Sequence, residues 1–559
     1  MYMGIDLGTT NTVVSRSFVD ADGRLITEVV QLGQMYQDNW EKFSTLPSMI
    51  YFDGDQYYVG REAKRQREWD REHVITNSKR FMGTSHTWNI DGQVLEAKDV
   101  AAMVLQHCKK TIEREGNMNY ETVVITVPAS FNPEQIEDTM KAAKQAGFQD
   151  DQIKIRHEPT AALLSFIDGE VKKSRQDRYL DLSRRKRIMV FDLGGGTCDI
   201  SIIDVQAGDK EMCFQEVAIG RYQELGGIDF DNRLALGLLN RYFKENQILE
   251  GTVSDREKNE MFVKLLLAAE TIKEKLTSVI NAKLSMAEGG QIDKDSISVK
   301  HNIPQFYNGR PFRIQITKAE YDEYTKDLYI DTNVHYKKFE DMEKHKNIIT
   351  IIRKTLEDYN INKASIDYVF MTGGMSQFPT VQEKISEYVG KPVIVPENPM
   401  DAVARGASIY QYYKVREESL AQEKEASEKF VDSMMLAEAV MLDMKEGLPR
   451  VIIPKKTVVP YSGEIRGEFT ISSPSGIKLD IYIGENEWDS SMRIQKSLEK
   501  PFNFPVQTGT PFDIEYTINE NKAIEMKIIV QGARREEVEV SIRSDIRIKE
   551  QDYNIVIDE

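Results

Sequence analysis

The chain has 559 residues, and its 73 lysines and arginines are outnumbered by 90 aspartates and glutamates, which gives a net charge of −17. This acidic balance argues against nucleic acid or an anionic membrane as a general partner. Hydrophobic residues make up 40% and charged residues 29% of the chain. These proportions are typical of a globular protein with a sizeable core, and the length allows roughly three to five domain-sized units.

The chain opens with a predicted strand, a glycine-containing turn and a second strand, in which residues 3–14 read MGIDLGTTNTVV. Further along, residues 47–52 predict a strand, and residues 60–65 open a charged helix. Residues 97–113 carry apolar side chains at helical spacing. A buried strand is predicted at residues 123–128, and Asn132 before Pro133 predicts a helix start that Gly147 ends.

A second glycine turn organises the middle of the chain, where residues 187–201 read RIMVFDLGGGTCDIS. Three glycines between two apolar strands let backbone N–H groups close on an anion without interference from side chains. Asp192 enters this turn and Asp199 leaves it, and paired carboxylates beside such a loop suit a hydrated divalent cation on a polyphosphate. Two related hairpins in one chain predict a duplicated fold whose halves hold one ligand from opposite sides.

Helices are expected next, and after them the spacing of the apolar residues changes from the helical period to the strand period. The helical segments are residues 230–246, 256–276, 317–339 and 346–359, then a strand at 366–371 and a closing helix from 398. Residues 411–429 predict an exposed charged helix or linker. Beyond about residue 450 the apolar residues alternate with polar ones, as in 479–483 and 514–518, which predicts an antiparallel β-domain.

Six motifs resemble the heat-shock 70 family of ATP-driven chaperones: residues 4–11, 125–129 (ITVPA), 158–162 (EPTAA), 192–199, 225–231 (LGGIDFD) and 372–374 (TGG). They occur in the family's order. The resemblance implies an α/β two-lobed actin-like ATPase domain, a duplicated ribonuclease H-like fold, followed by an all-β sandwich. The expected boundaries are 1–415 for the nucleotide-binding domain, 416–449 for a charged helical linker and 450–559 for a β-sandwich that resembles the family's substrate-binding domain.

The same resemblance implies the site residues. The catalytic positions are Asp6, Lys79, Glu158, Asp192, Thr197 and Asp199, and Asp6, Asp192 and Asp199 would also orient the metal. The nucleotide would be held by Gly8, Thr9, Thr10, Asn11, Gly194, Gly195, Gly196, Thr197, Gly226, Gly227, Glu270, Lys273, Glu274, Thr277, Gly373, Gly374, Met375, Gln377 and Asp401.

The implied function is slow Mg-ATP hydrolysis coupled to binding of polypeptide by the β-domain, in protein folding and the stress response. The implied cofactors are ATP or ADP with Mg²⁺, and K⁺ is a further candidate. The implied partners are unfolded or extended polypeptides, with J-proteins and nucleotide-exchange factors as co-chaperones; neither nucleic acid nor a membrane is expected.

Several positions depart from the family pattern. Glu274 and Gln377 stand where metazoan members stack arginines on the base, and loss of both contacts costs roughly one to three decades of affinity. Ser130 and Ile136 replace an aromatic residue and an arginine of the coupling relay, which makes altered coupling a hypothesis. The position of the interdomain linker is not obvious, because residues 431–436 and 439–444 are both candidates. No long helical segment follows the predicted β-domain, so the family's helical lid is expected to be missing.

Two alternatives stay open. A nucleotide-gated scaffold with one dedicated protein partner would keep the ATPase residues, and the altered relay makes it credible. A small-molecule kinase of the same actin-like fold would share the phosphate hairpins, but residues 158–162 and the additional β-domain argue against it.

The expected location is the cytoplasm. Cys108, Cys198 and Cys213 form no disulfide framework, which favours a reducing compartment. The first strand begins almost at the N-terminus, which leaves no room for a signal peptide, and no apolar run approaches the ~20 residues of a membrane span.

Overall fold

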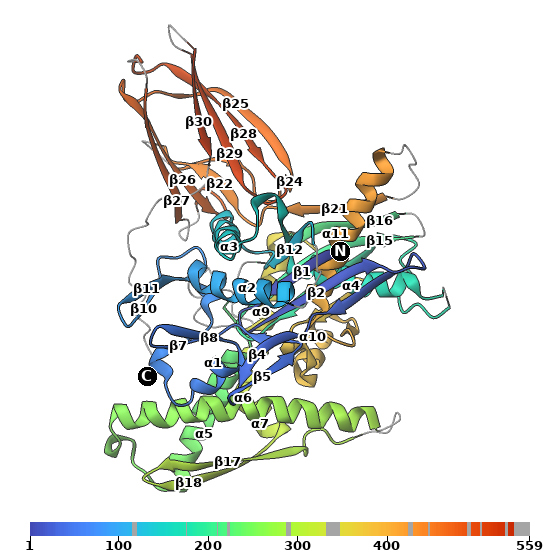
Figure 1. Ribbon diagram of the computed structural model, residues 1–559, viewed down its shortest axis with the longest axis vertical. Coiled ribbons are helices and arrows are strands. Elements are labelled where there is room, and N and C mark those ends of the chain that lie inside the picture. Colours follow the sequence, from blue (N-terminus) through green and yellow to red (C-terminus); the bar gives the residue numbers. More distant parts are fainter. Residues whose placement is uncertain are drawn as a thin grey trace. The chain divides into compact units, whose positions relative to one another are not determined.

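The computed structural model (Figure 1) describes residues 1–114, 120–174, 176–208, 211–220, 224–286, 292–330, 347–422, 429–444, 448–488, 493–502, 506–531 and 535–541. The chain divides into two compact units. Unit 1 comprises residues 1–157, 213–216 and 407–559, and unit 2 comprises residues 158–212 and 217–406. The two units are described separately below.

The first sheet of unit 1 has the strand order β13-β12-β1-β2-β3. Strands β1, β12 and β13 are parallel, whereas β1, β2 and β3 are antiparallel neighbours. Met3, Ile5 and Leu7 on β1 are buried, as the apolar run at the N-terminus predicts. The strands are β1 (Tyr2–Leu7), β2 (Asn11–Val19), β3 (Leu25–Val29), β6 (Leu46–Pro47), which pairs with β2, β12 (Val123–Val127) and β13 (Ile153–His157).

Two helices, α2 (Ala97–Arg114) and α3 (Pro133–Gln145), confirm the predicted helices of this region. Asn132 caps α3 reciprocally with Gln135, because each side chain accepts the other residue's backbone N–H, at 2.9 and 3.0 Å. The smaller elements are β4 (Leu32–Tyr36), β5 (Asn39–Phe43), β7 (Ile50–Asp53), β8 (Gln56–Val59), α1 (Arg61–Gln66), β9 (Val74–Ile75), η2 (Ser78–Phe81), β10 (Thr87–Ile90) and β11 (Gln93–Glu96).

The sheet of unit 2 repeats the arrangement of unit 1, with the order β20-β19-β14-β15-β16. Here too an antiparallel hairpin is extended by two parallel strands, because β14 pairs antiparallel with β15 and parallel with β19, which pairs parallel with β20. The predicted duplication is confirmed by this repeated topology. The strands are β14 (Lys186–Leu193), β15 (Cys198–Ala207), β16 (Glu211–Ile219), β19 (Tyr368–Thr372) and β20 (Val393–Ile394).

Helices and one further hairpin complete unit 2. The long helix α6 packs against α5 and against β17, and the apolar faces of these elements share one core. The elements are α4 (Glu158–Lys172), α5 (Gly227–Glu245), α6 (Asp255–Met286), β17 (Ser298–Tyr307), β18 (Arg310–Thr317), α7 (Lys318–Thr325), η5 (Lys326–Leu328), α9 (Ile348–Asp358), η7 (Gly374–Gln377) and α10 (Pro379–Val389). The predicted helix at 317–339 is described only to residue 330, and the rest of that prediction lies outside the described residues.

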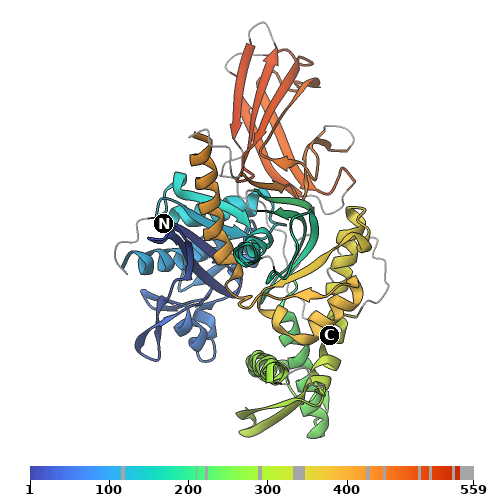
Figure 2. The ribbon, with the colours of Figure 1, turned by 90° about the vertical axis from the view of Figure 1, so that its right-hand side faces the viewer.

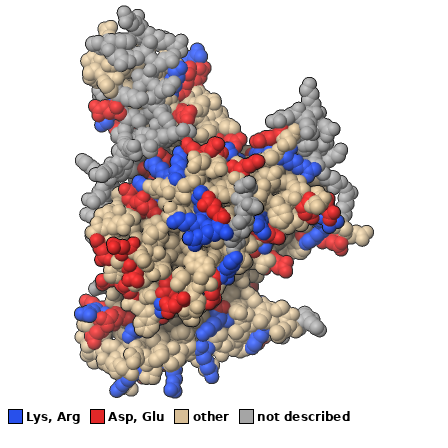
Figure 3. Space-filling view, in the orientation of Figure 1, with Lys and Arg blue, Asp and Glu red and all other residues tan. Residues whose placement is uncertain are grey.

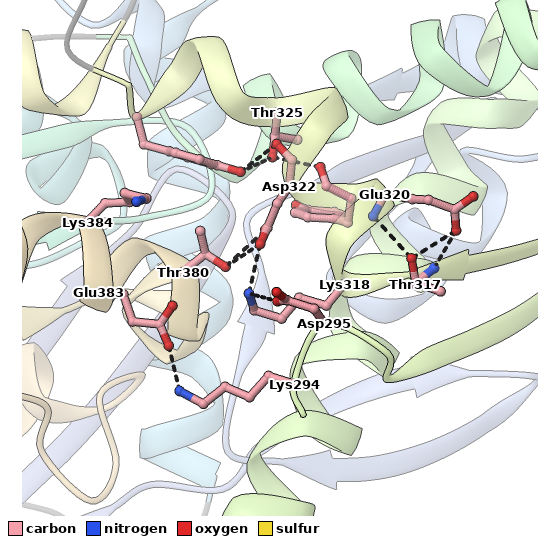
Figure 4. A network of polar contacts seen from close by, with 12 residues as sticks. Lys294, Asp295, Thr317, Lys318, Glu320, Asp322, Thr325, Thr380, Glu383 and Lys384 are labelled. Carbon is pink, nitrogen blue, oxygen red and sulfur yellow. Dashed lines mark hydrogen bonds and ion pairs between the residues drawn. The ribbon is translucent and has the colours of Figure 1, made fainter. Parts of the chain in front are cut away.

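A polar network around the buried Lys318 joins α7 to α10 (Figure 4). The Lys318 side chain is 5% exposed, and its Nζ lies 2.8 Å from Asp322 and 3.0 Å from Asp295. Thr380, at the start of α10, donates its hydroxyl to the Asp322 carboxylate at 2.9 Å. Burial raises the pKa of Asp322 even though Lys318 and Thr380 oppose this shift.

Helix α11 (Ala402–Gln422) passes from unit 2 into unit 1. Within unit 1 it lies along β2 (Figure 2), where Ser408 Oγ is 2.7 Å from Ser15 Oγ and 2.8 Å from Ser17 Oγ. The predicted exposed helix at 411–429 is therefore the end of α11 as far as residue 422, and its inner face is anchored on the sheet.

The C-terminal part of unit 1 folds into two antiparallel sheets around one apolar core, with the orders β23-β22-β26-β27 and β25-β28-β29-β30. Ile481 and Ile514, one from each sheet, are both fully buried in that core. The β-sandwich predicted from alternation is thus confirmed. Its strands are β22 (Ala439–Leu442), β23 (Arg450–Ile453), β25 (Tyr461–Thr470), β26 (Gly476–Gly484), β27 (Arg493–Pro501), β28 (Pro511–Ile518), β29 (Ile524–Gln531) and β30 (Arg535–Ser541).

The prediction of a helical linker at 416–449 is wrong for residues 429–435 and 439–442, which form strands. Residues 429–435 form strand β21 (Lys429–Met435), which lies beside β16 and pairs with β24 (Val458–Val459), and β22 already belongs to the sandwich. Met434, Leu436 and Val440 are buried, so these apolar side chains serve packing between strands. Residues 439–442 are all apolar and all buried, so no alternation marks them as a strand in the sequence.

The surface carries charges of both signs. On the face drawn in Figure 3, acidic and basic side chains lie in small interspersed groups. None of the described helices has the length and apolarity needed to cross a bilayer.

Candidate functional site

The first glycine turn joins β1 to β2 in unit 1. A Cβ on Gly8 would lie 2.2 Å from the Asn11 carbonyl oxygen, so only glycine fits at this position. Ser48 Oγ donates to the Gly8 carbonyl at 2.7 Å, and the Ser48 N–H donates to the Thr10 carbonyl at 2.8 Å. The Thr9 and Thr10 hydroxyls are buried, and within the described residues neither has a hydrogen-bond partner. Two such hydroxyl groups are suited to donate to an anionic oxygen.

Lys79 belongs to the same part of unit 1, on the short helix η2. Its side chain is buried, with 7% exposure, and its ammonium group lies 5.8 Å from the centre of the Phe131 ring. Gly8, Lys79, Thr126 and other residues line one small cavity. A buried cation beside a backbone turn with available hydroxyl groups is an arrangement suited to phosphate.

The second glycine turn lies in unit 2 between β14 and β15. Asp192 and Asp199 are directly opposite each other across the hairpin, and Gly194 N–H donates to the Thr197 carbonyl at 3.0 Å. The first residues of α5 lie against this turn, because Gly227 N–H donates to the Gly194 carbonyl at 3.0 Å.

Close backbone packing fixes the identity of two more glycines. A Cβ on Gly226 would lie 2.5 Å from the Gly196 nitrogen. Gly373 has φ of +83°, and a Cβ there would lie 2.5 Å from Asp192 Oδ1. The structure therefore brings together three of the predicted glycine segments, 194–196, 226–227 and 373–374, around the end of one hairpin.

The predicted adenosine face on α6 contains an ion pair. Lys273 Nζ lies 2.6 Å from Asp231 Oδ2 and donates to the Gly227 carbonyl at 3.1 Å. Burial raises the pKa of Asp231 to about 6, with Lys273 opposing the shift and Glu270 and Glu274 adding to it. Lys273 therefore connects α6 to the start of α5.

Three further predicted residues of this region, Thr277, Gln377 and Asp401, have local partners. Thr277 donates its hydroxyl to its own helix at the Lys273 carbonyl, 2.8 Å away, and the Gln377 carbonyl accepts from Asn281 Nδ2 at 3.0 Å. Asp401 lies 3.1 Å from Arg405, and burial raises its pKa.

Two contacts were missed by sequence reasoning. Asp231 and Asn281 each bind a predicted site residue, Lys273 and Gln377 respectively. The signal for Asp231 was its place in the motif LGGIDFD. No comparable signal marks Asn281.

Glu158 is the first residue of α4 and follows β13 directly. Its side chain is buried, with 7% exposure. A carboxylate at a helix N-terminus is favoured by the unpaired backbone N–H groups there.

A model of the family described as "Hsp70 protein" matches residues 2–306 and 311–494 of this chain. The chain belongs to the Hsp70 family. Two curated relatives are the chaperone protein DnaK of Thermosipho melanesiensis, 26% identical, and the chaperone protein DnaK of Thermosipho africanus, 27% identical. Each match covers the whole of this chain and 82% of the relative.

Membership establishes the general character of the protein. Hsp70 proteins are ATP-dependent chaperones that bind ATP or ADP with Mg²⁺ and act on polypeptide clients together with co-chaperones. Their fold, a two-lobed actin-like ATPase domain followed by a β-sandwich, agrees with the repeated sheets and the sandwich of this chain.

The residues present suit the Hsp70 cofactor. Asp192 and Asp199 are opposite each other across the hairpin, so their carboxylates lie on the same face of the sheet, and hard oxygen donors are what Mg²⁺ prefers. The Thr9 and Thr10 hydroxyls suit a phosphate, as shown above. Among the described residues, no three His, Cys, Asp or Glu side chains gather as a complete protein metal site.

The two departures from the Hsp70 coupling pattern are both buried. Ser130 is 5% exposed, and its hydroxyl has no hydrogen-bond partner among the described residues. Ile136, on α3, is 2% exposed and packs as a core residue. The Ala129 carbonyl next to Ser130 accepts from Lys522 Nζ of the sandwich at 3.4 Å.

Proposed function

We propose that this Hsp70-family chain hydrolyses Mg-ATP slowly and binds extended polypeptide through its β-sandwich. The observation that carries the proposal is the polar cradle in unit 1, where the Thr9 and Thr10 hydroxyls and the buried Lys79 belong to one glycine turn and the cavity next to it. Without an anion, the Thr9 and Thr10 hydroxyls would stay buried without a partner among the described residues, at a cost of about 1–3 kcal/mol each.

The residues have separate roles in this proposal. Thr9 and Thr10 donate to phosphate oxygens, and the backbone of residues 194–196 does the same from the second turn. Lys79 compensates charge on the transferred phosphate, and Glu158 holds the attacking water. When bound, Mg²⁺ neutralises charge on the phosphate oxygens, and Asp6, Asp192 and Asp199 would hold it through its water ligands.

Lys79→Ala is the direct test of hydrolysis. Because phosphoryl transfer depends on positioned charge, we expect single-turnover hydrolysis to fall by about 10²-fold or more. Lys110→Ala is the matched control, since Lys110 is an exposed lysine on α2. A wild type that hydrolyses ATP no faster than Lys79→Ala would refute the proposal, and repeating the assay with Na⁺ in place of K⁺ tests the potassium dependence.

The base is expected to be held less selectively than in relatives with stacking arginines. Glu274 and Gln377 stand at the positions of the stacking arginines, and Lys273 donates its ammonium group to Asp231. We propose that phosphate contacts provide most of the affinity. Calorimetry with ATP, GTP and CTP should show discrimination of less than about tenfold, and a preference for ATP beyond about 10³-fold would contradict this.

Coupling between the ATPase and the sandwich is proposed to use altered contacts, because Ser130 and Ile136 replace two relay residues. The affinity for a labelled unfolded peptide should then differ between the ATP-bound and ADP-bound protein. Equal affinities would show that the two activities are not coupled.

The replacement of two relay residues by Ser130 and Ile136 also favours a second function. In that function the β-sandwich binds one dedicated folded protein instead of many unfolded clients. Client profiling separates these functions, because a chaperone captures many unfolded peptides, whereas a scaffold captures one folded protein.

A further inference from the structure

A short turn connects the helix that carries Lys79 to helix α3. Lys79 lies on η2, which ends at Phe81, and the Gly83 N–H that follows donates to Asp138 Oδ2 on α3 at 2.8 Å. Within the turn, the Met82 N–H donates to the Lys79 carbonyl at 3.3 Å. The Asp138 carboxylate therefore holds the backbone that directly follows Lys79.

The same turn also packs closely against the N-terminus of α3. Gly83 has φ of +73°, in the left-handed region that favours glycine, and a Cβ there would lie 2.8 Å from Gln135 Cγ. Gln135 is itself held in place, because it caps α3 reciprocally with Asn132. A hydrogen bond and a close packing contact thus seat the turn independently on one helix end.

The seated turn forms part of the wall of the cavity beside the first glycine turn. Met82 is 1% exposed, and it lines this cavity together with Lys79 and Gly8. The short helix η2 packs against α2, which in turn packs against α3. A displacement of residues 79–83 away from α3 would therefore move Lys79 within the cavity.

The surroundings of Asp138 suit an acceptor for a backbone N–H. Burial raises the pKa of this carboxyl group, while the Gly83 N–H, Lys141 and Lys98 oppose the shift by favouring the charged form. Lys141 lies on α3, and Lys98 lies on α2. A hydrogen bond from a backbone N–H to a carboxylate is stronger than one to a neutral oxygen. Asp138 is therefore a firm anchor for the turn.

We propose that Asp138 is a positioning residue, which fixes the turn after Lys79 and so places the Lys79 ammonium group for ATP hydrolysis. A lysine side chain has many rotamers, and its charge is delivered accurately only from a backbone that does not move. Asp138 acts on the reaction through Lys79. The inference rests on the role of Lys79 in hydrolysis that is proposed above.

Two substitutions at Asp138 test this role. Asp138→Ala removes the acceptor, and we expect single-turnover hydrolysis to slow by about tenfold with the Kd for ATP unchanged within about twofold, because a misplaced catalytic group affects the reaction more than binding. Asp138→Asn keeps an oxygen acceptor at the same place and should stay within about threefold of the wild-type rate.

Glu137→Ala is the matched control on the same helix, because Glu137 pairs with Lys141 at 3.3 Å and should leave the rate within about twofold of wild type. A wild-type rate for Asp138→Ala, or equal losses in Asp138→Ala and Asp138→Asn, would overturn the positioning role.

A pair of glycine substitutions tests the seating of the turn without altering Asp138. Gly83 and Gly92 both have positive φ, at +73° and +86°, but an added Cβ has no atom within 4 Å at Gly92. Gly83→Ala should push the turn off Gln135 and slow hydrolysis by about tenfold, whereas Gly92→Ala should stay within about twofold of the wild-type rate. Equal rates for these two variants would contradict the seating.

Combining Lys79→Ala with Asp138→Ala separates positioning from an independent effect. If Asp138 acts through Lys79, the double variant should hydrolyse ATP no more slowly than Lys79→Ala alone. A further loss of about tenfold in the double variant would overturn the positioning role while leaving the proposed ATPase intact. A wild type no faster than Lys79→Ala would overturn both proposals.

Discussion

At the scale of single residues, the candidate site is built from close backbone approaches that exclude side chains. Gly226 meets the nitrogen of Gly196, and Gly373 meets a carboxylate oxygen of Asp192, each at 2.5 Å from the position of a Cβ atom. These glycines therefore pack one turn against another, in addition to leaving backbone N–H groups open to an anion.

Gly226→Ala is expected to destabilise unit 2 by about 1–3 kcal/mol, because the new methyl group would overlap backbone atoms that cannot rotate away. The control is Gly169→Ala on α4, where nothing lies within 4 Å of the added Cβ. That change should stabilise the protein by about 0.5–1 kcal/mol, since alanine is the better helix former. Urea unfolding of both variants measures the difference, and equal stabilities would show that the turns are not in tight contact.

Asp231 predicts a pH dependence of stability. Burial raises its pKa from 3.8 to about 6, so between these values the folded protein holds a proton that the unfolded chain has lost. Its contribution to stability is therefore present at low pH and is lost as the pH rises through about 6, an effect of up to about 3 kcal/mol. The difference in unfolding free energy between wild type and Asp231→Asn should grow in favour of the wild type as the pH falls from 7.5 to about 4.5. A difference that does not change with pH would contradict the assignment.

At the scale of elements, tertiary polar contacts fix how helices join. Lys318, at the start of α7, is held by Asp295 before β17 and by Asp322, which also accepts from Thr380 on α10 (Figure 4). Such a network is not visible in the sequence, because its members are up to 85 positions apart, from Asp295 to Thr380 (380 − 295 = 85).

Lys318→Met is expected to lower the stability of unit 2 by about 1–3 kcal/mol, because it leaves the half-buried Asp322 carboxylate without its cation. Lys326→Met is the control: Lys326 pairs with Glu323 at the surface, and its loss should cost less than about 1 kcal/mol. Thermal unfolding compares the two variants. If both variants melt at the same temperature, the network contributes no more than a surface ion pair.

At the scale of the whole molecule, the sequence predicts most helices, strands and glycine turns, but it does not predict how the segments between domains pair with distant strands. The hairpins with Gly8 and Gly194–Gly196, the cap at Asn132 and the alternating strands of the sandwich each carry a local signal in residue type or spacing. The sequence predicts a helical linker where the structure has strands β21 and β22, because short apolar runs fit either the helical or the strand period and the pairing of these strands is set by distant strands. The predicted catalytic and nucleotide-binding roles remain proposals.

The central proposal is that the chain binds one Mg-ATP and that each of its two glycine turns contributes to the affinity. Thr10→Val and Thr197→Val remove one hydroxyl from each turn with little change of shape, and Thr87→Val, at an exposed position, is the control. Titration calorimetry with Mg-ATP should give one site per chain, with affinity lowered by about tenfold or more in each turn variant and unchanged in the control. If either turn variant binds ATP as tightly as the wild type, or if the wild type binds two equivalents at independent sites, the account is contradicted.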